Sequence, residues 1–170
     1  MLPQASSPAF VALAAGVVTA TVVDIRSRRI PNVLTGSMAA VGVALAAAGL
    51  SGISIGASLA GMVAGLLLML PGYALGATGA GDVKLMAAVG AVIGIHVIVN
   101  AFLFTALAGG VLAIAVAVRR RRLRATLSGT SRLIASPAGA RQEIQGAPKA
   151  SRFAYGPAIA LGSVIAALMG

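Results

Sequence analysis

Residues 55–85, IGASLAGMVAGLLLMLPGYALGATGAGDVKL, join a long apolar run to a glycine-rich turn that ends in Asp82. The run from about 55 to 75 carries no charge and is long enough to cross, as a helix, a hydrocarbon core of about 30 Å. A second apolar stretch begins at Val83, directly after the turn. This part of the chain therefore predicts two membrane helices, with a carboxylate at the membrane edge between them.

Apolar runs continue on both sides of this segment. Hydrophobic residues make up 59% of the 170 residues and charged residues 9%, a composition far more apolar than that of a soluble domain. Breaks at charged residues or at Gly, Pro and Ser give spans over about 8–23, 32–50, 55–75, 83–118 (long enough to cross twice, with its turn near 95–100) and 153–170. We expect an all-α fold: a polytopic membrane helix bundle of about six transmembrane helices, forming a single domain over residues 1–170.

Positive charge is confined to alternate connections of this arrangement. The 13 Lys and Arg residues fall between the first two spans, at Lys84, and in a basic loop of about 119–152. The positive-inside rule assigns these connections to the cytoplasm, which predicts that the N-terminus and the C-terminus lie outside. The net charge of +10 then reflects topology and contact with membrane lipid, and we expect no nucleic-acid partner.

Acidic residues are rare: the chain holds Asp24, Asp82 and Glu143. Glu143 lies in the basic loop and is interpreted as a solvated surface charge. Asp24 ends the first span and Asp82 precedes the fourth, so both are predicted at the cytoplasmic face, where ionisable groups beside hydrocarbon are costly. Two carboxylates suffice to hydrolyse a peptide with water, because the ionised one takes a proton from the water while the protonated one polarises the carbonyl.

Simpler roles exist for each aspartate. Asp82 would cap a helix that starts at Val83 by accepting its free N–H groups, and Asp24 would pair with Arg28 at the interface. If the two carboxylates do work as a pair, helix polarity favours a charged Asp82 at a helix start and a protonated Asp24 at a helix end. This polarity predicts Asp82 as the base and Asp24 as the acid.

Other catalytic chemistries have few residues available. The chain has no cysteine, and His96 is its one histidine, predicted at the face opposite the aspartates. Thiol nucleophiles, cysteine-ligated zinc and multi-histidine metal sites are therefore excluded or nearly so, and we expect no metal and no cofactor.

The segment Gly79-Ala-Gly81-Asp82 is a GxGD motif. Its glycines lack side-chain bulk and permit unusual backbone angles, so a substrate strand is expected to approach Asp82 closely. Lys84 follows two positions later, either as a tuning or substrate-contacting group or as an anchor that extends to the interface.

With these residues the chain resembles the type IV prepilin peptidase family, the GxGD-type intramembrane aspartic proteases. The matching segments are Asp24-Ile25 with Arg29-Ile-Pro-Asn32, Gly79-Ala-Gly-Asp-Val-Lys-Leu85, and Tyr155-Gly-Pro-Ala-Ile-Ala-Leu-Gly162. The resemblance implies that Asp24 and Asp82 are the catalytic pair. It further implies an endopeptidase of the bacterial plasma (inner) membrane that cuts the leader of a prepilin or pseudopilin at the cytoplasmic face.

The resemblance is to the short, peptidase-only form of the family that occurs with tight-adherence pili. Larger members also carry a methyltransferase domain with a cysteine-rich zinc motif, which this cysteine-free sequence does not contain. The alternative is a non-enzymatic membrane protein, a small transporter or a pilus-assembly scaffold, in which the two aspartates bind a cation or a proton. The residues leave the individual pilin and the oligomeric state open.

Overall fold

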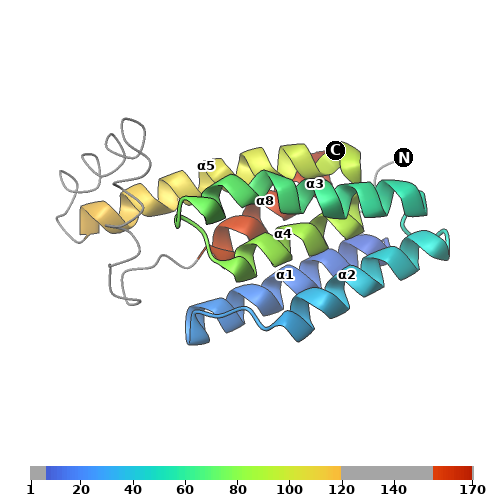
Figure 1. Cartoon of the computed structure of the whole chain (residues 1–170), viewed down its shortest axis with the longest axis horizontal. Coiled ribbons are helices and arrows are strands. Elements are labelled where there is room, and N and C mark those ends of the chain that lie inside the picture. The colour runs from blue at the N-terminus through green and yellow to red at the C-terminus, as the bar shows by residue number, and fades with distance from the viewer. Residues whose placement is uncertain (1–6, 120–154, 170) are drawn as a thin grey trace.

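The computed structural model describes residues 7–119 and 155–169. These residues form six helices and contain no strand, so the predicted all-α helix bundle is confirmed (Figure 1). The helices are α1 (Pro8–Ser27), α2 (Asn32–Ala47), α3 (Ile55–Ala74), α4 (Ala80–Ile93), α5 (Ile95–Arg119) and α8 (Gly156–Met169). Apart from Arg119, the predicted basic loop of about 119–152, Glu143 included, lies outside the described residues.

Serine side chains mark two of the helix starts. The Ser7 hydroxyl accepts the backbone N–H of Phe10 at 3.2 Å, and the Ser54 hydroxyl accepts that of Ala57 at 3.1 Å. Pro31 precedes α2, where its fixed φ suits a chain about to enter a helix. The beginnings of α1 and α3 therefore follow from ordinary capping residues and that of α2 from Pro31, all close to the starts predicted from the sequence.

The break between α4 and α5 differs from the prediction. It lies at Gly94, whose φ of 77° is readily adopted only by glycine, and α5 begins at once with Ile95. His96 and Asn100, the polar residues that suggested a turn near 95–100, are exposed on α5 instead. The turn is therefore set by a backbone angle rather than by polarity.

The helices also differ in length. Among the described residues, α1, α3 and α5 are long and apolar enough to cross a membrane, whereas α2 and α8 are shorter apolar helices. The 14 residues of α4 rise about 21 Å at about 1.5 Å each, less than a hydrocarbon core of about 30 Å. The bundle thus has the six predicted helices, of which three reach spanning length.

The short helix α4 is the centre of the bundle. It packs against each of the other five described helices, and every residue from Leu85 to Ile93 is buried. Glycines bring the neighbouring backbones close: a Cβ atom on Gly61 of α3 would meet the carbonyl oxygen of Gly90, and one on Gly42 of α2 would lie 2.8 Å from the carbonyl carbon of Ala91. Small residues allow this approach where lipid gives no hydrophobic drive for helices to pair.

The connections between helices alternate between the two ends of the bundle. Figure 1 shows the α1–α2 and α3–α4 connections at one end, together with the end of α5 and the start of α8. The α2–α3 and α4–α5 connections lie at the other end (Figure 1). Asp24, Asp82 and Gly156 therefore come to the same end from three separate parts of the chain.

The glycine contacts predict a strong difference between two chemically identical substitutions. Gly61→Ala should lower the free energy of unfolding by about 1–3 kcal/mol, because its methyl group would collide with the backbone of Gly90 and Gly94. Gly36→Ala on α2 has nothing within 4 Å of the new methyl group and should be neutral or slightly stabilising. Unfolding in mixed detergent micelles measures both, and equal effects would contradict the packing described for α3 and α4.

The one-sided charge pattern predicts the orientation of the bundle. Reporters fused after Arg29, after Ala77 and within 124–149 should read cytoplasmic, because the basic residues share that side. Fusions near Gly52 and His96 should read external. An external signal after Ala77 would place Asp82 on the wrong side and overturn the predicted topology.

Candidate active site

Asp24 lies in the last turn of α1, which continues to Ser27. Its side chain is buried, with 6% of the residue exposed. The carboxylate Oδ2 accepts the backbone N–H of Gly156, the first residue of α8, at 3.0 Å. A Cβ atom on Gly156 would lie 2.8 Å from this oxygen, so the contact depends on glycine at that position. Asp24 is thus part of the last turn of α1, while its carboxylate contacts the start of α8.

Asp82 lies in the first turn of α4 and is 8% exposed. Its Oδ2 accepts the backbone N–H of Gly79 at 2.8 Å. The helix begins at Ala80 with Gly79 as its N-cap, three residues before the predicted start at Val83. Asp82 therefore caps α4, as the sequence suggested. It does so from inside the first turn, by accepting the N–H of Gly79, the residue that precedes the helix.

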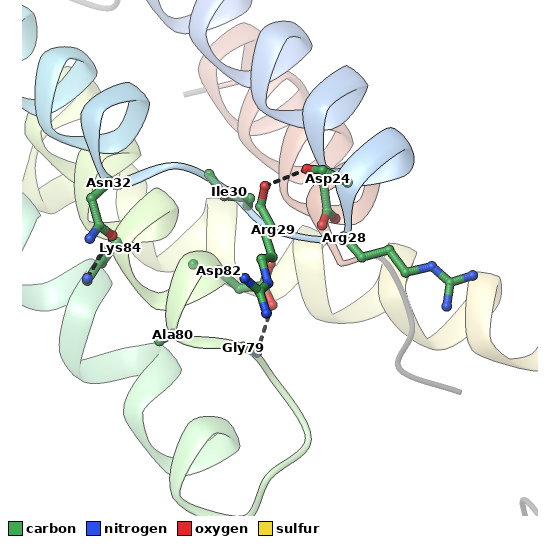
Figure 2. Close-up of a pocket in the computed structure, with 11 residues that line it drawn as sticks. Asp24, Arg28, Arg29, Ile30, Asn32, Gly79, Ala80, Asp82 and Lys84 are labelled. Carbon is green, nitrogen blue, oxygen red and sulfur yellow. Dashed lines mark hydrogen bonds between the residues drawn. The ribbon is translucent and has the colours of Figure 1, made fainter. Parts of the chain in front are cut away.

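Both carboxylates line one cavity of about 540 Å³ (Figure 2). Asp24 reaches it from α1 and Asp82 from α4. Each carboxylate accepts a backbone N–H through Oδ2. The other lining residues are Ser27, Arg28, Arg29, Ile30, Asn32, Gly79, Ala80, Gly81 and Lys84. The structure thus brings together the two aspartates and all the predicted motif residues.

The motif glycines do not use the unusual backbone angles that glycine permits. Gly79 has a φ of −87°, and the glycines with positive φ among the described residues are Gly49, Gly52, Gly76 and Gly94. Approach of a substrate strand to Asp82 stays a prediction. A Cβ atom on Gly81 would lie 3.1 Å from Cβ of the buried Ile30. Gly79 holds Asp82 through its N–H, and Gly81 leaves room for Ile30, so both shape the wall of the cavity.

The basic residues beside the aspartates make contacts of their own. The exposed Lys84 donates from Nζ to Oδ1 of Asn32 at 2.8 Å, which ties α4 to the first residue of α2 (Figure 2). Arg28 ends α1 with a φ of 51°, and its backbone N–H donates to the backbone carbonyl of Asp24 at 2.8 Å. In the view of Figure 2 the Arg28 side chain extends away from both carboxylates.

Neither His96 nor a metal-binding cluster accompanies the two aspartates in the described part of the chain. His96 is exposed at the start of α5, at the end of the bundle opposite the aspartates (Figure 1). Within residues 7–119 and 155–169 no group of three or more His, Cys, Asp or Glu side chains is placed to hold a metal ion.

The Gly156 N–H is the site group that sequence reasoning missed. Gly156 is 132 residues from Asp24 in the sequence, and nothing local connects them. The signal that was available is the segment Tyr155-Gly-Pro157, which marks the start of a helix by its glycine and proline. That segment is typical of a helix start, but it does not indicate that the Gly156 N–H contacts Asp24.

Comparison with known proteins now gives the family. Residues 11–114 match the model of the type IV leader peptidase family. The matched segment runs from α1 into α5 and includes Asp24, Asp82 and all the other residues that line the cavity. No curated protein and no solved structure gives a match. Because the family match covers more than half of the 170 residues, the chain belongs to the type IV leader peptidase family and is a membrane protein with peptidase activity.

Proposed function

We propose that the chain is an aspartic endopeptidase that cuts the leader from type IV prepilins or pseudopilins, with Asp24 and Asp82 as its catalytic pair. One observation carries the proposal: two buried carboxylates from different helices line the same cavity at one end of the bundle. Membership of the family supports leader-peptidase activity in general. The basic residues at this end support a multi-pass protein of the bacterial plasma membrane with the cavity facing the cytoplasm.

The proposed reaction uses one proton shared by the pair. The ionised aspartate takes a proton from a water molecule as the water oxygen attacks the scissile carbonyl carbon, and the protonated aspartate gives its proton to the carbonyl oxygen. The resulting diol collapses when its C–N bond breaks and the departing nitrogen receives a proton from the aspartate that had accepted one. The other aspartate, which had given its proton to the carbonyl oxygen, takes a proton back from a diol hydroxyl, so the product carboxyl group forms and the pair again shares one proton. A backbone N–H on each Oδ2 orients both carboxylates toward the shared cavity, where water and substrate would bind.

The hydrogen bonds also change the expected roles within the pair. Asp24 was expected to be the acid because it follows a helix end, yet its carboxylate accepts an N–H at the start of α8. Asp82 accepts an N–H at the start of α4. Both carboxylates therefore meet the positive end of a helix, and the α8 donor offsets the negative end of α1 at Asp24, so the polarity difference between them is reduced. We propose that the resting proton belongs to the pair rather than to either residue.

The transporter alternative fits the geometry less well. Transport sites are usually near the middle of the membrane, at interrupted helices. The interruption between α4 and α5 at Gly94 lies at the end of the bundle opposite the two carboxylates (Figure 1). The carboxylates instead line a cavity at the connections between helices, which is where a peptide substrate would bind. The geometry therefore favours hydrolysis.

Replacing either aspartate tests the pair directly. Asp24→Asn and Asp82→Asn should each reduce cleavage of a co-expressed prepilin by at least about 100-fold, because an amide can neither accept nor supply the proton. His96→Gln, at the far end of the bundle, serves as the control and should retain cleavage. Near wild-type processing by either Asn variant, at equal protein level in the membrane, would refute the catalytic assignment.

Sharing of the proton has its own spectroscopic signature. Near neutral pH the wild type should show one protonated-carboxyl infrared band, and that band should disappear in both Asp24→Asn and Asp82→Asn. Each remaining carboxylate then lacks the negative neighbour that made ionisation of both unfavourable. A band that persists in one variant would show that the surviving aspartate holds the proton by its own environment, contrary to the proposal.

A further inference from the structure

Tyr155 occupies a notch in α5. It directly precedes α8, and its ring lies over the buried Gly109. A Cβ atom on Gly109 would be 2.8 Å from Oη of Tyr155 and 2.9 Å from both Cε2 and Cζ. The neighbouring Gly110 has nothing within 4 Å of the same added atom. The missing side chain at Gly109 is therefore what admits the ring.

A second close contact joins the same two helices. A Cβ atom on Gly162 would meet Oγ1 and the backbone of Thr105, a residue that is 0% exposed. The helices α5 and α8 run in opposite directions, so the two contacts lie at successive levels along the pair (Figure 1). Contacts at two levels fix both the height and the rotation of α8 against α5.

The fixed start of α8 is also the donor of the Asp24 hydrogen bond. The backbone carbonyl of Tyr155 accepts the N–H groups of Ala158 and Ile159 at 3.0 and 3.1 Å. That carbonyl and the N–H of Gly156 belong to one planar peptide unit, so they move together. The N–H of Gly156 therefore cannot shift relative to Asp24 unless the Tyr155 peptide unit shifts too.

We infer that Tyr155 is a positioning residue of the active site: its ring, seated at Gly109, holds the N–H of Gly156 on the carboxylate of Asp24. This inference rests on the proposed catalytic role of Asp24. It gives α5 a part in setting the geometry of the pair, although no described residue of α5 lines the cavity that holds the aspartates. The ring acts by its shape, and its hydroxyl is not required.

Four variants test the inference. Gly109→Ala and Tyr155→Ala should each lower kcat for prepilin cleavage by about 10- to 100-fold while KM changes less than about threefold, because small misplacements of a catalytic group are costly. Gly110→Ala, the same change one residue along α5, should leave kcat unchanged. Tyr155→Phe keeps the ring and should retain most of the activity.

Infrared spectra of the substrate-free protein provide a readout that does not depend on cleavage. The carboxyl bands of the pair, identified as those that change in Asp24→Asn, should shift in Gly109→Ala and Tyr155→Ala as the Gly156 hydrogen bond is lost, and should not move in Gly110→Ala. Because these bands are measured without substrate, they test the positioning of Asp24 even if the Asn variants show that Asp24 is not catalytic.

Three results would overturn the inference. Loss of activity in Tyr155→Phe equal to that in Tyr155→Ala would assign the role to the hydroxyl. A rise in KM with unchanged kcat would make Tyr155 part of a substrate contact, through the apolar cavity of about 710 Å³ that it lines with Leu67 and Phe102. Unshifted carboxyl bands of the pair in Gly109→Ala protein with wild-type thermal stability would show that the notch does not control the hydrogen bond.

Discussion

The backbone contact between α3 and α4 at Gly61 and Gly90 is the constraint on which the rest of the bundle depends. Lipid gives helices no hydrophobic reason to associate, so packing must come from close fit. At 14 residues, α4 is too short to cross a membrane unaided, and it packs against all five other described helices. Ser58 of α3 adds a buried hydrogen bond from its hydroxyl to the carbonyl of Ala91 at 2.6 Å. Because α4 is surrounded, its first turn holds Asp82 in a defined position.

The two buried carboxylates must be stabilised away from water and yet remain able to exchange protons. A carboxylate removed from water needs partners, yet a carboxylate bound tightly to a cation would be a poor acid or base. Asp24 and Asp82 each take a backbone N–H at a helix start as partner, a donor that cannot itself give up its proton under these conditions. Meanwhile Lys84 is hydrogen-bonded to Asn32. Two neutral backbone donors thus help to orient the pair, which fits a role in proton transfer.

Sequence reasoning succeeded where the determinant is local. Apolar runs gave six helices, and in a chain with three acidic residues the candidates Asp24 and Asp82 followed almost directly. It failed where the determinant is a backbone angle or a distant contact. The turn at Gly94 depends on a positive φ that composition does not reveal. The partner of Asp24 is 132 residues away and is a backbone group, which no side-chain pattern identifies. The catalytic assignment itself remains a prediction.

The hydrogen bond from Gly156 to Asp24 joins the first described helix to the last. A ribosome makes Asp24 long before it makes Gly156, so during synthesis the carboxylate has entered its place in α1 while its donor does not yet exist. The two can meet only after α8 has folded against α5 and α1. Completion of the site therefore waits for α8, and a nascent chain that stops before α8 carries both aspartates without the Gly156 donor that orients Asp24.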